Sequence, residues 1–253
     1  MTVSRGIRMP VHCGAAGAAA LRAYTELDDT SILTSLSAAH VWGVPLPPGP
    51  GGDWRIHLAR RRGFSFPRRS NVVGHLLSFL PDEVREYDGV RVTSPARTWL
   101  DLASVLAVQD LVAAGDYLVC SHGPGFPRPR EALCGLDALR DVISRHGGMR
   151  GIKTAREAIE LVRVGADSAP ETHMRLALID AGLPEPVLNH VLFDQGGIPS
   201  LWPDAAYPQW GIALQYDGGH HAGEEQHLEG DRPAVVRKVR EALQSRGWTR
   251  DGR

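Results

Sequence analysis

The pattern of hydrophobic and polar residues predicts alternating short strands and helices over the first half of the chain. The stretches 54–59 and 71–77 have the apolar alternation of strands. Asp88-Gly89, between two further runs of this kind, indicates a β-hairpin. Residues 33–41 have helical character and are followed by Gly43 and several prolines, which stop a helix. We therefore expect an α/β protein.

Helices dominate the middle of the chain. Ser94-Pro95 is a helix start, with serine as N-cap and proline at the first helical position. Arg97 on this helix is expected to pair with Asp101, four residues further on. Further helices are expected at 108–119, 136–145 and 152–164, and the Gly/Pro/Arg stretch 123–130 is expected to be an exposed loop.

The last third of the chain predicts one helix, several strands and a final helix. Ser168 to Glu171 has the spacing of a capping box, and Gly182 is expected to end the helix that follows. A strand is expected at 186–193. Two more buried strands carry Asp204 and Gln215, and a last helix is expected at 235–244.

Composition excludes several classes of protein. The 253 residues carry a net charge of -1 and are 43% hydrophobic, so the chain can bury cores and is not a generally basic nucleic-acid coat. No apolar run is long enough for a membrane span, and no signal peptide is recognisable. The three cysteines (Cys13, Cys120 and Cys134) have no CxxC spacing, which argues against a zinc knuckle or disulfide framework and is compatible with a reducing cytoplasm.

The most informative polar residues follow the two buried strands near the C-terminus. Asp204 lies on one strand, and the next strand ends in Gln215-Tyr216-Asp217, shortly before His220-His221. Carboxylates gathered at the ends of neighbouring strands commonly hold a divalent metal ion through oxygen ligands.

This arrangement resembles the PD-(D/E)XK nuclease superfamily, and more closely the very-short-patch-repair-like endonuclease domains of the actinobacterial DUF559 group. Asp204 matches the first aspartate of that group, Tyr216-Asp217-Gly218 matches the core of the second motif, and His221 matches its histidine. The resemblance implies a restriction-endonuclease-like mixed sheet flanked by helices. It also implies Mg²⁺ or Mn²⁺ on Asp204 and Asp217, no nucleotide cofactor, and DNA as substrate.

The resemblance also implies roles for three further residues. Glu171 would hold a metal-bound water, and His221 would act as general base or leaving-group acid. Gln215 stands where the family has glutamate, and an amide dipole replaces a full negative charge. We therefore expect weak metal affinity and reduced or absent cleavage.

The first half of the chain resembles a second family, the AbiEi-like antitoxins of type IV toxin–antitoxin systems. The similarity lies in residues 90–103, which contain Thr-Ser-Pro-Ala-Arg-Thr, and in residues 36–45. The expected regions are 1–133 as the antitoxin-like body, 134–165 as a helical connector and 166–253 as the nuclease-like domain. The winged helix and the last nuclease strand of similar proteins look absent. This resemblance implies a toxin as partner.

Simpler interpretations stand beside each of these. Asp204 after Pro203 is also typical of a turn, Asp217-Gly218 of a tight turn, and Glu171 of a helix cap. A basic stretch with interleaved aromatics, Phe64 and Phe66, could contact DNA or could be a solvated loop. Its basic residues are Arg60, Arg61, Arg62, Arg68 and Arg69. The sequence thus favours a Mg²⁺-dependent DNA endonuclease-like protein, with a non-catalytic DNA-binding or antitoxin-like regulator as the alternative.

Overall fold

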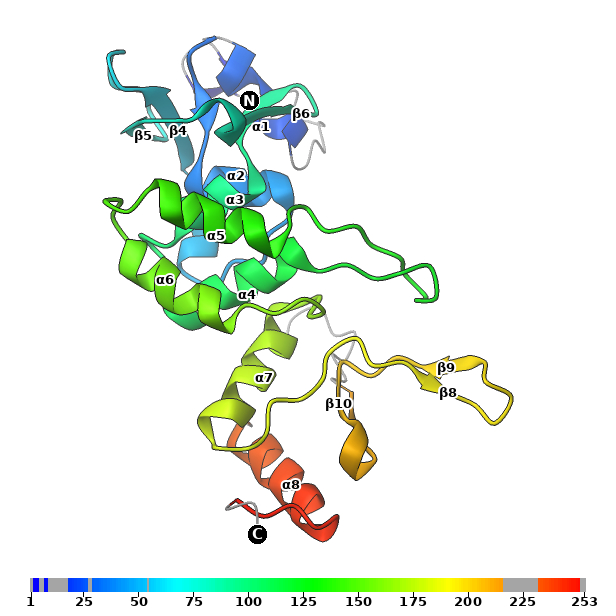
Figure 1. Ribbon diagram of the computed structural model, residues 1–253. Coiled ribbons are helices and arrows are strands. Elements are labelled where there is room, and N and C mark those ends of the chain that lie inside the picture. The colour runs from blue at the N-terminus through cyan, green and yellow to red at the C-terminus, as the bar shows by residue number, and fades with distance from the viewer. Residues whose placement is uncertain are drawn as a thin grey trace. The chain divides into compact units, whose positions relative to one another are not determined.

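The computed structural model describes residues 2–4, 7–8, 18–26, 29–53, 55–215 and 232–250. The chain has a mixed α/β fold (Figure 1) and divides into two compact units. The first unit contains residues 1–118 and 133–162, and the second contains residues 119–132 and 163–253. This division differs from the sequence-based one, because the helices expected as a connector belong to the first unit and residues 119–132 belong to the second.

A mixed five-stranded sheet forms one layer of the first unit. Its strand order is β5-β4-β3-β7-β6, with parallel pairs β4–β5 and β3–β7 and antiparallel pairs β3–β4 and β6–β7. Its strands are β3 (Ile32–Leu33), β4 (Ile56–Arg61), β5 (Val72–Leu77), β6 (Val84–Tyr87) and β7 (Val90–Thr93). The Asp88-Gly89 turn expected between β6 and β7 is present, and both residues have positive φ (46° and 73°).

Helices cover this sheet and stack on one another. In Figure 1, α2 packs on β4 and β7, α3 packs on α2, α5 packs on α3, and α6 packs on α5. The helices of the unit are α1 (Ala18–Glu26), α2 (Ser35–Trp42), α3 (Pro95–Leu102), α4 (Val108–Val119, whose last residue is assigned to the second unit), α5 (Leu136–Arg145) and α6 (Ile152–Leu161). A short antiparallel pair, β1 (Thr2–Ser4) and β2 (Ile7–Arg8), precedes them.

The predicted start of α3 is confirmed. Ser94 Oγ accepts a hydrogen bond from the Arg97 N–H, and Pro95 occupies the first helical position. Arg97 is buried and bonds Asp101 at 2.9 Å, as the i,i+4 spacing predicts. It also bonds Glu83 at 2.6 Å and the Ser78 carbonyl, so this arginine connects the segment between β5 and β6 to the helix.

The described residues of the second unit form two helices and two hairpins. The predicted strand at 186–193 is largely irregular: only residues 192–193 form a strand, and Val187 makes an isolated bridge to Ala206. The elements are α7 (Ala169–Asp180), β8 (Leu192–Phe193), β9 (Pro199–Leu201), β10 (Ala205–Tyr207), β11 (Ile212–Leu214) and α8 (Arg232–Ser245).

The core of the second unit lies between α7, α8 and the β10–β11 hairpin. Leu178, Tyr207 and Leu243 are fully buried there, and Trp248 packs against them after the end of α8. Gly182, at φ 73°, follows α7 as predicted. Within the described part of the chain, no helix combines the length and the apolar character needed to cross a bilayer.

Candidate functional site

Asp204 and Gln215 face each other at the end of the β10–β11 hairpin. The antiparallel register pairs Ala205 with Leu214, so the residues just outside the ladder, Asp204 and Gln215, are direct cross-strand neighbours. The Gln215 Nε2 amide donates to both carboxylate oxygens of Asp204, at 3.2 and 3.1 Å. Asp204 is half-buried and Gln215 is exposed, so solvent reaches this pair.

Glu171 lies in the first turn of α7, near this pair. Its carboxylate accepts hydrogen bonds from the Ser168 hydroxyl at 2.7 Å and from the Asp167 N–H at 3.0 Å. Ser168 caps the helix, so the expected cap is present, although Glu171 reaches back to the N–H of Asp167 rather than of Ser168. Burial raises the pKa of Glu171, and the negative charges of Asp204 and Asp167 add to the rise.

The donor set of these three residues fits a hard divalent cation. Asp204 offers two carboxylate oxygens, and Gln215 offers a carbonyl oxygen once its amide group turns. Mg²⁺ is commonly bound by one or two carboxylates and completed by water, so Asp204 and Gln215 would be its ligands. The oxygens of Glu171 accept the hydrogen bonds of the helix cap, so Glu171 would lie next to these ligands without binding the cation directly. The other two predicted site residues, Asp217 and His221, lie outside the described residues.

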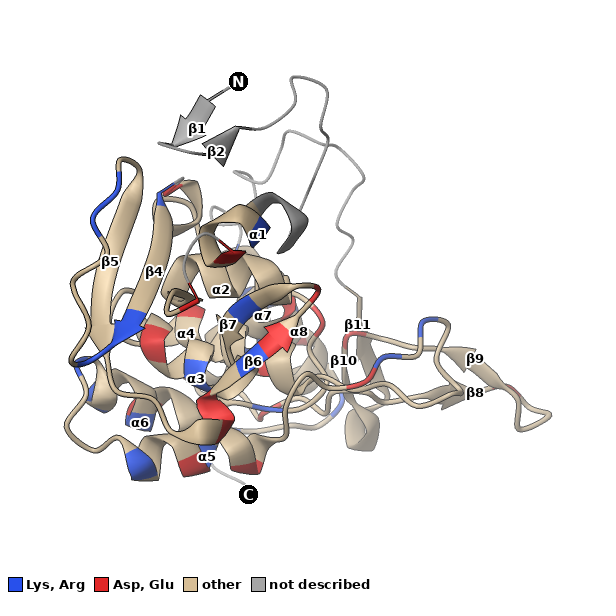
Figure 2. Ribbon diagram, turned by 90° about the horizontal axis from the view of Figure 1, so that it is seen from above, with Lys and Arg blue, Asp and Glu red and all other residues tan. Residues whose placement is uncertain are grey.

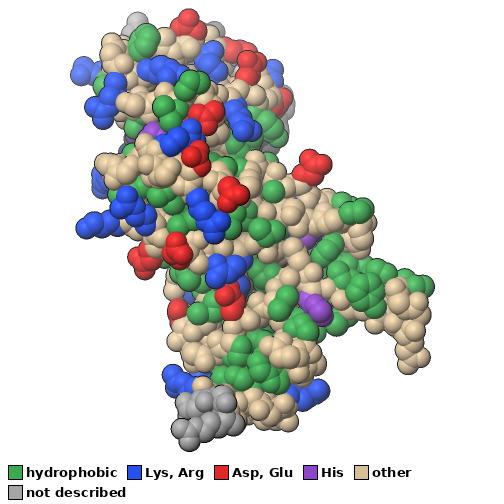
Figure 3. All heavy atoms as spheres, viewed as in Figure 1, with side chains coloured by type: hydrophobic (Ala, Val, Ile, Leu, Met, Phe, Trp, Pro, Cys, Tyr) green, Lys and Arg blue, Asp and Glu red, His purple; other side chains and the backbone are tan. Residues whose placement is uncertain are grey.

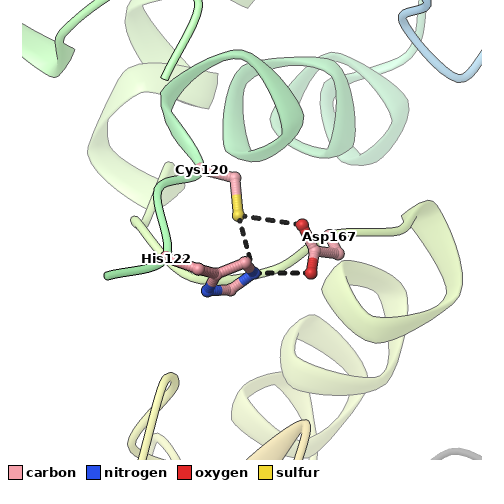
Figure 4. Close-up of side chains that lie close together, drawn as sticks. All are labelled: Cys120, His122 and Asp167. Carbon is pink, nitrogen blue, oxygen red and sulfur yellow. Dashed lines mark hydrogen bonds and ion pairs between the residues drawn. The ribbon is translucent and has the colours of Figure 1, made fainter. Parts of the chain in front are cut away.

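A second polar cluster in the same unit was not among the predicted site residues. Cys120, His122 and Asp167 converge on one point, as Figure 4 shows. The Cys120 Sγ lies 3.5 Å from the His122 Nε2 and 3.2 Å from the Asp167 Oδ1, and the same His122 Nε2 lies 2.5 Å from the Asp167 Oδ2. Arg130 adds an ion pair to the Asp167 Oδ1 at 3.0 Å.

The elements around this cluster explain its geometry. Cys120 and His122 alternate along an extended segment that follows α4, and His122 pairs with Arg130 in an isolated antiparallel bridge. Asp167 directly precedes the N-cap of α7. The only local sequence signal for the cluster is Cys-x-His in this segment, because the third member, Asp167, is more than forty residues away along the chain.

Burial and neighbouring charge set the ionisation of the cluster. Burial raises the pKa of the Cys120 thiol to about 12, helped by its hydrogen bond to Asp167. Burial also acts to raise the pKa of Asp167, but hydrogen bonds from Cys120 and His122 outweigh it and lower that pKa. Without a bound cation, the cluster is therefore a neutral thiol beside an ionised carboxylate.

The predicted basic stretch divides into two groups along the β4–β5 pair. These strands are parallel, so the loop between them runs back from the carboxyl end of β4 to the amino end of β5. Arg60–Arg62 therefore lie at one end of the strands and Arg68–Arg69 at the other, about 17 Å apart for a six-residue strand. Figure 2 shows Lys and Arg at both ends of this pair, and Figure 3 shows the basic side chains of the visible face scattered among acidic and apolar ones.

Some of these arginines interact within the protein. Arg60 bonds the Ser65 hydroxyl at 2.7 Å, and Arg61 bonds the Phe79 carbonyl at 2.9 Å. Arg62 and Arg68 are exposed. Phe64 and Phe66 are each about half exposed (49% and 46%).

Comparison with known proteins adds relatives but no function. The chain is 30% identical over 168 residues to two uncharacterized proteins of Mycobacterium tuberculosis, MT2308 of strain CDC 1551 / Oshkosh and Rv2248 of strain ATCC 25618 / H37Rv. The match covers 66% of this chain and 55% of each relative, so the chain spans about half the length of the curated relatives it matches. No family model and no solved structure matches the chain.

Proposed function

We propose that the second unit carries a nuclease-type site that hydrolyses phosphodiester bonds of DNA with the help of Mg²⁺ or Mn²⁺. One observation carries the proposal: the fold brings Asp204 and Gln215 within 3.2 Å of each other, with the Glu171 carboxylate close enough for Asp204 to raise its pKa. The resemblance to DUF559-type domains assigns these same positions to metal-dependent cleavage.

Asp204 and Gln215 would contribute unequally to the binding of the metal ion. A bound divalent cation supplies charge neutralisation for the phosphate and an activated water. Asp204 would hold this cation with a full negative charge, whereas Gln215 would contribute only an amide dipole. Because the site has fewer negative charges than the family pattern, we expect weak metal binding and slow cleavage.

Plasmid cleavage tests this proposal. Supercoiled plasmid and single-stranded DNA are incubated with Mg²⁺, Mn²⁺ or EDTA and with the native protein, Asp204→Ala or Gln215→Glu. We expect metal-dependent nicking that disappears in Asp204→Ala and increases in Gln215→Glu, because a second carboxylate strengthens divalent-metal binding. Matched controls are Asp180→Ala and Gln209→Glu, two exposed positions of the same unit.

The outcomes separate clearly. Cleavage by Gln215→Glu alone would still support a nuclease scaffold that has lost a ligand. Equal cleavage by the native protein and by Asp204→Ala would overturn the site assignment. No cleavage by any folded variant would reject the nuclease proposal and favour the second candidate.

The second candidate is a non-catalytic DNA-binding or antitoxin-like regulator, and the exposed basic stretch favours it. Arg62 and Arg68 could neutralise phosphates, and the half-exposed Phe64 and Phe66 could stack on bases. This binding would need no metal ion and would weaken as salt concentration rises.

A gel-shift assay in EDTA tests this candidate. We expect Arg62→Glu/Arg68→Glu to weaken DNA binding and flatten its salt dependence, because two phosphate contacts are lost. Arg140→Glu/Arg156→Glu, exposed positions on α5 and α6, changes the net charge equally and serves as control. Equal effects of the two double substitutions would contradict a contact through the basic stretch.

Either activity would act in the cytoplasm, where DNA is accessible. The free thiols of Cys120 and Cys134 are compatible with a reducing compartment. A toxin remains the partner that the AbiEi-like resemblance implies.

A further inference from the structure

The convergence of Cys120, His122 and Asp167 has the form of a transition-metal site. A thiol sulfur, an imidazole nitrogen and a carboxylate oxygen lie within 4.8 Å of one another. The Cys120 residue is fully buried, and the His122 side chain is only 7% exposed. We propose that these three side chains bind Zn²⁺, with the fourth tetrahedral position open to water.

The separations between the donor atoms support tetrahedral coordination. With metal–sulfur bonds of about 2.3 Å and metal–nitrogen or metal–oxygen bonds of about 2.0–2.1 Å, tetrahedral ligand atoms stand about 3.3–3.6 Å apart. The Cys120 Sγ lies 3.5 Å from the His122 Nε2, within this range, and 3.2 Å from the Asp167 Oδ1, slightly below it. The other carboxylate oxygen, Asp167 Oδ2, lies 2.5 Å from the His122 Nε2. The carboxylate would therefore have to move away from the histidine by about 0.8 Å and from the sulfur by a few tenths of an ångström.

The kind of ligand selects the kind of metal. Thiolate and imidazole suit Zn²⁺ and other first-row transition metals, whereas Mg²⁺ prefers oxygen donors. This site would therefore be chemically distinct from the one at Asp204 and Gln215. It goes beyond the proposed nuclease function and does not depend on it.

A catalytic Cys-His-Asp triad does not fit the same geometry. In a triad, the histidine contacts the nucleophile with one ring nitrogen and the carboxylate with the other. Here the single His122 Nε2 faces both Cys120 and Asp167 (Figure 4). The side chains thus converge on one point instead of forming a relay.

Arg130 supports the carboxylate from outside the site. Its guanidinium bonds the Asp167 Oδ1 at 3.0 Å, while the Asp167 Oδ2 faces His122. Carboxylates that bind metals are commonly fixed by such outer hydrogen bonds. The rival interpretation is a purely hydrogen-bonded cluster in which Arg130 is the only cation that Asp167 meets.

Cobalt titration of the full-length protein separates the two interpretations. Chelator-treated protein is titrated with Co²⁺, and thiolate-to-cobalt charge-transfer absorption in the near ultraviolet is recorded. We expect about one equivalent of Co²⁺ to bind and Zn²⁺ to displace it. Cys120→Ser should abolish the charge-transfer band, and His122→Asn or Asp167→Asn should lower affinity at least about 10–100-fold.

Controls assign the signal to this cluster. Cys134→Ser and Cys13→Ser remove the other two cysteines and should keep the band. Asp204→Ala should keep it as well, which separates this site from the nuclease proposal. Absence of the band in folded native protein, or its persistence in Cys120→Ser, would overturn the inference.

Discussion

At the scale of single residues, Arg97 is the centre of a network of buried charges in the first unit. Arg97 lies between Glu83 and Asp101 and also stands over the Phe79 ring, 4.8 Å from its centroid. Glu83 has a second partner, His146 at the C-terminal end of α5, at 2.5 Å. Buried pairs of this kind contribute little when intact, but they leave an uncompensated charge when one partner is removed. Removal of one partner of Arg97 is therefore expected to destabilise the first unit.

Glu83 gives this network a pH dependence. Burial acts to raise the pKa of Glu83, but hydrogen bonds from His146 and the Leu80 N–H, with the charge of Arg97, lower it overall. The resulting stabilisation is present above the unfolded pKa of about 4.3 and is lost as the pH falls through the lower folded pKa. We expect Glu83→Gln to be less stable than native protein at about pH 7, with the difference narrowing below about pH 4.

Urea unfolding across this pH range measures the difference in the free energy of unfolding between native protein and Glu83→Gln. The nearby Asp101 opposes the trend, because burial raises its pKa despite Arg97 and Thr34. Asp137→Asn, at an exposed position on α5, is the control and should show no comparable narrowing. If the difference in the free energy of unfolding between native protein and Glu83→Gln stays constant with pH, the role given to Glu83 is contradicted.

At the scale of elements, the start of α6 depends on a glycine. Gly151 is the N-cap of α6 with φ 85°, and an added Cβ would lie 2.4 Å from the backbone carbonyl of Ala103 after α3. We expect Gly151→Ala to destabilise the protein by about 1–3 kcal/mol, because both the backbone conformation and the close approach are lost. Gly148→Ala, where an added Cβ meets nothing within 4 Å, should change stability by at most about 1 kcal/mol. Thermal unfolding compares the two, and equal losses would contradict this explanation.

The sequence predicts elements well where local signals are strong. Ser94-Pro95 and Asp88-Gly89 carry their structure in a few neighbouring residues, and both predictions are confirmed. The short strand β3 gives too brief a pattern to detect, because its two residues gain order only from β4 and β7 on either side. The stretch 186–193 is wrong as a continuous strand: it pairs only through the bridge from Val187 to Ala206 and the short strand 192–193, and its apolar residues Val187 and Phe193 are exposed.

In the candidate site, too, the sequence predicts only those contacts that form between residues connected by a short segment. Asp204 and Gln215 could be placed together from the sequence because one short hairpin joins their strands. Cys120 and Asp167 could not, because helices α5 and α6 separate them along the chain and only the folded chain brings them together.

At the scale of the whole molecule, neither unit is a continuous piece of sequence. Residues 119–132 interrupt the first unit and contribute to the second, and the chain then returns to build α5 and α6. The proposed zinc ligands Cys120 and His122 come from this interruption, and Asp167 comes from the second unit's main segment. The cluster would therefore fasten the inserted segment to the start of α7.

This interleaving limits how the gene can be rearranged. A single breakpoint after residue 162 would carry α7 and the β10–β11 hairpin away without the inserted segment, and one after residue 118 would separate α5 and α6 from α3, on which α5 packs. The two units are thus encoded by one indivisible segment of the gene, and a recombination event that preserves both units must exchange them together.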